Sequence, residues 1–155
     1  MQVLTGQYPQ MYTHKYRLRY TDYSAAGVKY KAVKLFDVAR GYQVLWCMMQ
    51  CPVLFAGPGL STVTFRIHQS NTLPATDSAN GAYMSLAHNS QLPYVGNFQT
   101  IQPRTASVGG VSRTIIGDVS AAYSIYSTIQ LSGTPNLNQL TNGTIDIWVC
   151  IIKVP

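Results

Sequence analysis

Strict alternation of two kinds of side chain is the feature that most constrains this fold. In the segment HKYRLRY, residues 14–20, basic residues alternate with tyrosine and leucine. The basic positions are Lys15, Arg17 and Arg19, and the positions between them are Tyr16, Leu18 and Tyr20. A period of two predicts a β-strand. We expect its basic side to face outward and its tyrosine side to face the core.

Further strands are predicted along the rest of the chain by the same period or by continuous apolar runs. They cover residues 28–36, 43–55, 61–68, 83–87, 98–101, 111–116, 123–131 and 144–154. The apolar phase of the second strand shifts after Ala32, which predicts either a bulge there or a strand that leaves one sheet for another. Pro52 is expected to end the hydrogen-bonded part of the apolar strand 43–55. The last strand is apolar on both faces, so we expect it to be central or buried in an interface.

The acidic residues argue against a helical alternative. All five are aspartates, and the chain contains no glutamate, a residue on which helix surfaces rely. Turn signals separate about eight short strands, a pattern typical of a sandwich or a jelly roll. We therefore predict an all-β protein, a single jelly-roll-like antiparallel β-sandwich. Residues 20–155 are expected to form this domain, and residues 1–19 an extended N-terminal arm.

Charge is scarce and unevenly distributed. Charged residues make up only 10% of the chain, so we expect much of the surface to be covered in an oligomer or a larger assembly. Most of the basic residues precede residue 41: Lys15, Arg17, Arg19, Lys29, Lys31, Lys34 and Arg40. A basic segment can meet nucleic acid, an acidic protein or an anionic membrane. We favour an acidic protein, because no nucleic-acid motif accompanies the charge.

Catalytic and metal-binding motifs are not found. The sequence has no GxSxG, HExxH or CxxC motif, and its three histidines are not clustered with the cysteines. Cys47, Cys51 and Cys150 lie in apolar runs and are expected to act as small buried hydrophobic residues. The sequence therefore predicts no catalytic, cofactor-binding or metal-binding residues, no cofactor and no enzyme activity. The start lacks an apolar signal region, which predicts a non-secreted protein.

Three stretches share recognisable patterns. Residues 21–42, TDYSAAGVKYKAVKLFDVARGY, have a polar start, small residues, a strand ending in LF and a turn. Residues 51–67, CPVLFAGPGLSTVTFRI, are like a hairpin of the form aFaG…gitsvtvsvG, and residues 129–152, IQLSGTPNLNQLTNGTIDIWVCII, are like the ending l.asGgnlnaLTaGsvdvyv. In these features the chain resembles a group of small tailed-phage virion proteins with one jelly-roll domain. The resemblance spans most of 20–155 and leaves 1–19 unmatched.

This resemblance implies a structural protein of the phage particle, a head decoration or cement protein made in the host cytoplasm. Its implied partners are the major capsid protein and further copies of itself, as a homotrimer, with no nucleic acid or membrane. The role of the arm is a separate hypothesis from its own residues. We expect it to contact a capsid subunit through Tyr8, Tyr12, Lys15, Tyr16, Arg17 and Arg19. Removal of residues 1–19 is then expected to abolish particle binding while the core stays folded.

Two other classes remain open. A glycan- or receptor-binding β-sandwich of a fibre or tail tip predicts exposed aromatic residues such as Tyr83 and Tyr94 in the loops after residue 69. An enzyme on a jelly-roll scaffold such as a cupin requires a histidine-rich metal cluster. Three separated histidines make this third class the poorest fit.

Overall fold

A computed structural model gives the structure of residues 1–3, 13–68, 84–89, 99–101, 105–108, 111–114 and 122–153. These residues form strands and two short 3₁₀ turns, η1 (Tyr20–Tyr23) and η2 (Leu137–Gln139). The strands are β1 (Gln2–Val3), β2 (His14–Arg19), β3 (Tyr30–Val38), β4 (Tyr42–Ala56), β5 (Leu60–His68), β6 (Met84–Asn89), β7 (Gln99–Ile101), β8 (Thr105–Val108), β9 (Val111–Thr114), β10 (Tyr123–Gly133) and β11 (Asn142–Lys153). The predicted all-β class is confirmed.

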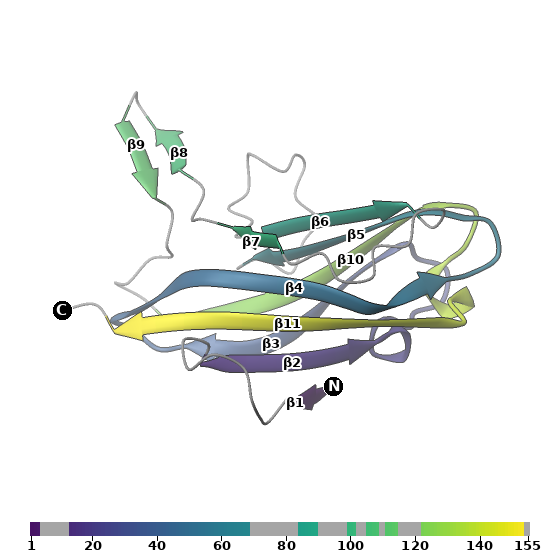
Figure 1. Cartoon of the computed structure of the whole chain (residues 1–155), viewed down its shortest axis with the longest axis horizontal. Helices are drawn as coiled ribbons and strands as arrows, with labels where there is room; N and C mark the ends of the chain where they lie inside the picture. Colours follow the sequence, from purple (N-terminus) through teal and green to yellow (C-terminus); the bar gives the residue numbers. More distant parts are fainter. Residues whose placement is uncertain are drawn as a thin grey trace.

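Two antiparallel sheets make up the body of the molecule (Figure 1). One has the strand order β1-β2-β11-β4-β7, and the other has the order β3-β10-β5-β6. Strands β8 and β9 form a separate hairpin. A cluster of buried apolar side chains draws on both sheets, so the core lies between them. This arrangement is compatible with the predicted β-sandwich.

Alternation along β2 and β11 is as predicted. Tyr16 and Leu18 of β2 are buried in the core, and Tyr20 packs against it. Strand β11 is central, between β2 and β4, with Ile145 and Ile147 fully buried on its core side. The outward side of β11 carries Asp146, Trp148 and Cys150, which are also buried. Both faces of this strand are therefore covered.

Strand β4 differs from its prediction at two of the three places where its register with β11 shifts. Pro52 does not end the strand, which continues to Ala56. The pairing with β11 moves from Gln50 to Val53 across this site, so the extra backbone length around Pro52 is taken up by a bulge. A second bulge at residue 45 reverses the alternation. Val44 consequently faces the core together with Cys47 and Met49, although Val44 and Cys47 are an odd number of residues apart.

Strand β3 also carries its bulge elsewhere than predicted. The phase shift was expected after Ala32, whereas the register with β10 shifts at Leu35, between the pairs of Lys34 and Phe36. Leu35 and Val38 are buried in the core. The bulge therefore lets two residues that are three apart reach the same side of the strand.

The turn η1 is fixed to the core by Tyr23. Its ring is fully buried and lies 6.3 Å from the ring of Phe55 and 6.1 Å from that of Phe65. The Tyr23 hydroxyl is 2.6 Å from the Ser127 hydroxyl of β10, which satisfies a polar group inside the core. Burial raises the pKa of Tyr23, so the phenol stays protonated. This anchor sets the position of the chain that leaves β2.

Candidate docking surface

The residues predicted to bind a partner are divided by the structure. Tyr8 and Tyr12 lie outside the described residues. Tyr16 is buried in the core and is not presented to a partner. Lys15, Arg17 and Arg19 lie on the outward face of β2, as the alternation predicts, and we call them the basic row.

The part of the expected arm from residue 14 onward is a sandwich strand. All six residues of β2 pair with β11, from Thr144 opposite Arg19 to Val149 opposite His14. Because Leu18 is fully buried between the sheets, removal of residues 1–19 would take a strand out of the core. A deletion that tests the arm without removing this strand ends at residue 12.

An ion pair holds the centre of the basic row. Arg17 Nε donates to Asp146 Oδ1 and Arg17 Nη2 donates to Asp146 Oδ2, both at 2.6 Å. The side chain of Asp146 is 6% exposed and that of Arg17 is 38% exposed. Two parallel charge-assisted hydrogen bonds compensate the buried carboxylate. The outward face of this sheet thus already binds one carboxylate with an arginine fork.

Arg19, two residues along, has a different neighbour. The residue across the strand is Thr144. The nearby Asp22 carboxylate accepts a hydrogen bond from the Met1 ammonium at 2.6 Å and one from the Arg19 backbone N–H at 2.8 Å. Burial raises the pKa of Asp22, but these hydrogen bonds, together with the positive charges of the Met1 ammonium and of Arg19, outweigh it and hold the pKa below its usual value. Asp22 therefore fixes the backbone at the end of β2, and the side chain of Arg19 is exposed.

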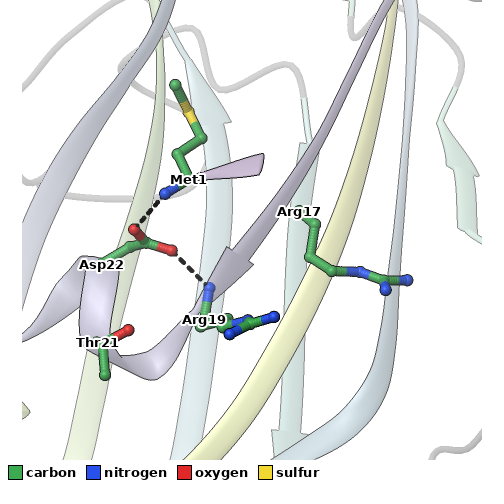
Figure 2. Close-up of a pocket in the computed structure, with 5 residues that line it drawn as sticks. All are labelled: Met1, Arg17, Arg19, Thr21 and Asp22. Atoms are coloured by element: carbon green, nitrogen blue, oxygen red, sulfur yellow. Dashed lines mark hydrogen bonds and ion pairs between the residues drawn. The ribbon is translucent and has the colours of Figure 1, made fainter. Parts of the chain in front are cut away.

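A cavity of about 310 Å³ lies beside these groups. Its lining residues are Met1, Arg17, Arg19, Thr21 and Asp22. Figure 2 shows the contacts of Asp22 with Met1 and with the Arg19 backbone, while the side chains of Arg17 and Arg19 leave β2 in the same direction. Cationic groups and a hydroxyl predominate in the lining, which suits an anion.

The lysines that follow in the sequence have structural contacts instead. Lys31 Nζ donates to the backbone carbonyls of Asp22 and Ser24, both at 3.0 Å, and so holds η1 against β3. Lys29 Nζ donates to the Gly133 carbonyl of β10. Lys34 Nζ lies 2.7 Å from Asp37 Oδ1 on the exposed surface. The basic stretch before residue 41 is therefore not one continuous binding patch.

Aromatic rings close the gap between β2 and β3. His14 stacks on Phe36 with ring centroids 4.0 Å apart, and Tyr16 lies 5.9 Å from the same ring. His14 Nδ1 is 2.9 Å from the Thr13 hydroxyl. Burial lowers the pKa of His14, so the neutral ring is favoured at this junction of the two sheets.

The three cysteines have buried thiols. Burial raises the pKa of Cys51 to about 11 and also raises the pKa of Cys47 and Cys150, so these thiols are protonated at neutral pH and are poor nucleophiles. Among the residues that the structure describes, no group of three or more His, Cys, Asp or Glu side chains is placed to hold a metal ion. The same residues include no helix of the length and apolarity needed to span a membrane.

Asp146 is the site residue that the sequence interpretation missed. The predicted strand 144–154 contains Asp146, but the sequence interpretation gives this residue no role, whereas in β11 it pairs with Arg17. A signal was present, since Asp146 alternates with isoleucines, and its neighbours on the same side of the strand, Thr144 and Trp148, carry no charge. Its partner Arg17 is 129 residues away, and only the register of β2 on β11 brings the two together.

Comparisons of the chain with family models, with curated proteins and with solved structures found no match.

Proposed function

We propose that this chain is a non-enzymatic structural protein of a phage virion that binds the capsid shell as a cement or decoration protein. The resemblance of residues 21–42, 51–67 and 129–152 to small tailed-phage virion proteins supports the class. The major capsid protein is the proposed partner, and the capsid surface is the proposed location. The low charge of the chain supports a protein whose surface is largely covered by neighbours, including its own copies in a trimer.

The proposed fold is a jelly roll of eight strands. Without the two-residue β1 and the separate β8–β9 hairpin, eight strands remain among those described, from β2 to β11. The first pairs with the last (β2 with β11), the second with the seventh (β3 with β10), the third with the sixth (β4 with β7) and the fourth with the fifth (β5 with β6). This nested pairing is expected when one long antiparallel ribbon wraps into two sheets. It supports the jelly roll, an architecture that viral capsid domains use.

The observation that best supports docking is the basic row on the outward face of β2. Arg17 and Arg19 leave the strand on the same side (Figure 2), next to the covered outward face of β11. Pairing with β11 fixes the backbone of β2 at both arginines, which limits the backbone entropy lost on binding. A weak contact of this kind gains strength when many copies bind one capsid lattice.

Co-sedimentation tests the proposal. Tagged protein is mixed with purified particles of the virus that encodes it, and the mixture is separated on a density gradient. We expect the full chain to travel with particles at a fixed ratio to the major capsid protein, and a variant without residues 1–12 to bind more weakly while it stays folded. A folded full chain that stays at the top of the gradient, or that binds a glycan array and no particle, would contradict the proposal.

A further inference from the structure

The guanidinium of Arg19 is an exposed binding group that lies beside the cavity, in the electrostatic field of the Asp22 carboxylate. On the same face, two residues earlier, Arg17 binds the carboxylate of Asp146 across the strand in a fork geometry. Arg19 has the same orientation on β2, but its partner position on β11 is Thr144, which carries no charge. Across the strand pair, the positions opposite Arg17 and Arg19 therefore differ by one carboxylate.

The charges around the cavity select the class of anion. The lining contains the Met1 ammonium, two guanidinium groups and the Asp22 carboxylate, and Asp146 neutralises Arg17. Together these groups leave an excess of one positive charge. A carboxylate carries one negative charge and matches the planar fork of arginine. A phosphate dianion would add a second negative charge close to Asp22 and Asp146, where repulsion disfavours it.

We infer that the cavity beside Arg19 binds an aspartate or glutamate side chain from an acidic segment of the partner protein. The guanidinium of Arg19 is the fork that receives this carboxylate, and the Thr21 hydroxyl in the lining is a second donor. The inference rests on the proposed function for the identity of the partner as a capsid protein. Its chemistry, one carboxylate on Arg19, is independent of that identity.

Thr144 offers a direct test, because a carboxylate at this position would occupy Arg19 from within the chain. In Thr144→Asp the new side chain faces Arg19 as Asp146 faces Arg17. Thr144→Asn has nearly the same shape without the charge and is the matched control. Arg19→Gln removes the guanidinium and provides a second test if Thr144→Asp does not fold. Arg40→Gln removes an exposed arginine from the β3–β4 turn and controls for net charge.

The probe is an acetylated and amidated tetra-aspartate peptide, titrated at low salt into ¹⁵N-labelled full-length protein. We expect it to shift the Arg19 side-chain N–H resonance more than that of Arg40. Thr144→Asp and Arg19→Gln should weaken binding about fivefold, the order expected for one exposed ion pair, while Thr144→Asn and Arg40→Gln stay within about twofold of wild type. Equal binding by Thr144→Asp and Thr144→Asn, or an equal shift of Arg19 by inorganic phosphate at the same concentration, would overturn the inference.

Particle binding by the same variants separates the two proposals. If wild-type protein, Thr144→Asp and Arg19→Gln all travel with particles equally, the carboxylate site is wrong and the proposed function stands. If the peptide binds at Arg19 but wild-type protein does not travel with particles, the proposed function is wrong and the carboxylate site is supported. Loss of particle binding in Thr144→Asp together with retention in Thr144→Asn supports both.

Discussion

Two neighbouring basic regions of the chain use their charge differently. On β2, Arg17 is paired with a buried carboxylate and Arg19 is exposed beside a cavity. On the β3 side, Lys29 and Lys31 donate to backbone carbonyls. Arginine presents a planar fork that fits a carboxylate, whereas the lysine ammonium has three donors that can reach several carbonyls at once. Residue type thus distinguishes the strand that we propose for docking from the strand with structural lysines, where net charge does not.

The edges of the sheets support the same distinction. Strand β3 is the edge of its sheet and runs next to Lys29, with Lys31 and Lys34 within it. Lysines on an edge strand disfavour pairing with another chain. Strand β2 pairs with β11 along its whole length and with the two-residue β1 at Tyr16 and Arg17, and its basic row lies on a face of the sheet. We therefore expect a partner to contact the face of β2 and not the edge of β3.

The largest expected effect is in the ion pair that divides the basic row. Arg17→Met leaves the buried carboxylate of Asp146 without its counter-ion, so we expect a loss of about 3 kcal/mol in the free energy of unfolding. Asp146→Asn leaves only the partly exposed Arg17, which water can hydrate, and should cost about 1 kcal/mol. Urea denaturation of both variants measures the difference. A larger loss for Asp146→Asn would contradict this account of the pair.

A smaller loss of stability is expected on the β3 side. Lys31→Met removes both hydrogen bonds to the η1 carbonyls and should lower the free energy of unfolding by about 1.5 kcal/mol. Binding of the tetra-aspartate peptide should not change. Lys34→Met, which removes an exposed charge from the same strand, is the matched control and should leave the urea midpoint unchanged. Reduced peptide binding by Lys31→Met would show that the β3 side also contributes to peptide binding, and would contradict the distinction between the two regions.

A pH dependence is expected at the junction of β2 and β3. Because burial lowers the pKa of His14, the unfolded chain binds more protons than the folded chain between the folded-state pKa and about 6.5. The contribution of His14 is therefore complete above pH 6.5 and is lost as the pH falls through this range. His14→Phe should keep the stack on Phe36 and flatten the curve of urea midpoint against pH between about 7 and 5. Identical slopes of urea midpoint against pH for the variant and wild type would contradict the assignment of this pH dependence to His14.

The smallest effect on stability is expected at Arg19, the proposed binding residue. Arg19→Gln removes an exposed side chain, so its urea midpoint should equal that of wild type. The backbone N–H of Arg19, which donates to Asp22, is retained in this variant. Arg19→Gln and Lys31→Met are then opposite cases, one losing binding and the other stability. A destabilised Arg19→Gln protein would show that Arg19 is structural.

The faces of the regular strands could be predicted from the sequence because a period of two decides which side is buried. This holds for β2, for β11 and for Val63, Phe65 and Ile67 of β5. The bulges at residue 45, at Pro52 and at Leu35 reverse that period; Pro52 was read as the end of a strand, the shift near Leu35 was placed three residues too early, and residue 45 was not marked. The sequence also predicted which three residues form the basic row. Its division into a paired Arg17 and an exposed Arg19 depends on what β11 places opposite each, a register between segments about 130 residues apart.

Cryo-electron microscopy of the native particle would show whether β2 docks on the shell. We expect density for this sandwich on the capsid shell, with the outward face of β2 against a neighbouring protein and an acidic side chain of that protein beside Arg19. A particle map that contains the sandwich with β2 facing solvent, or a particle that lacks the chain altogether, would contradict it.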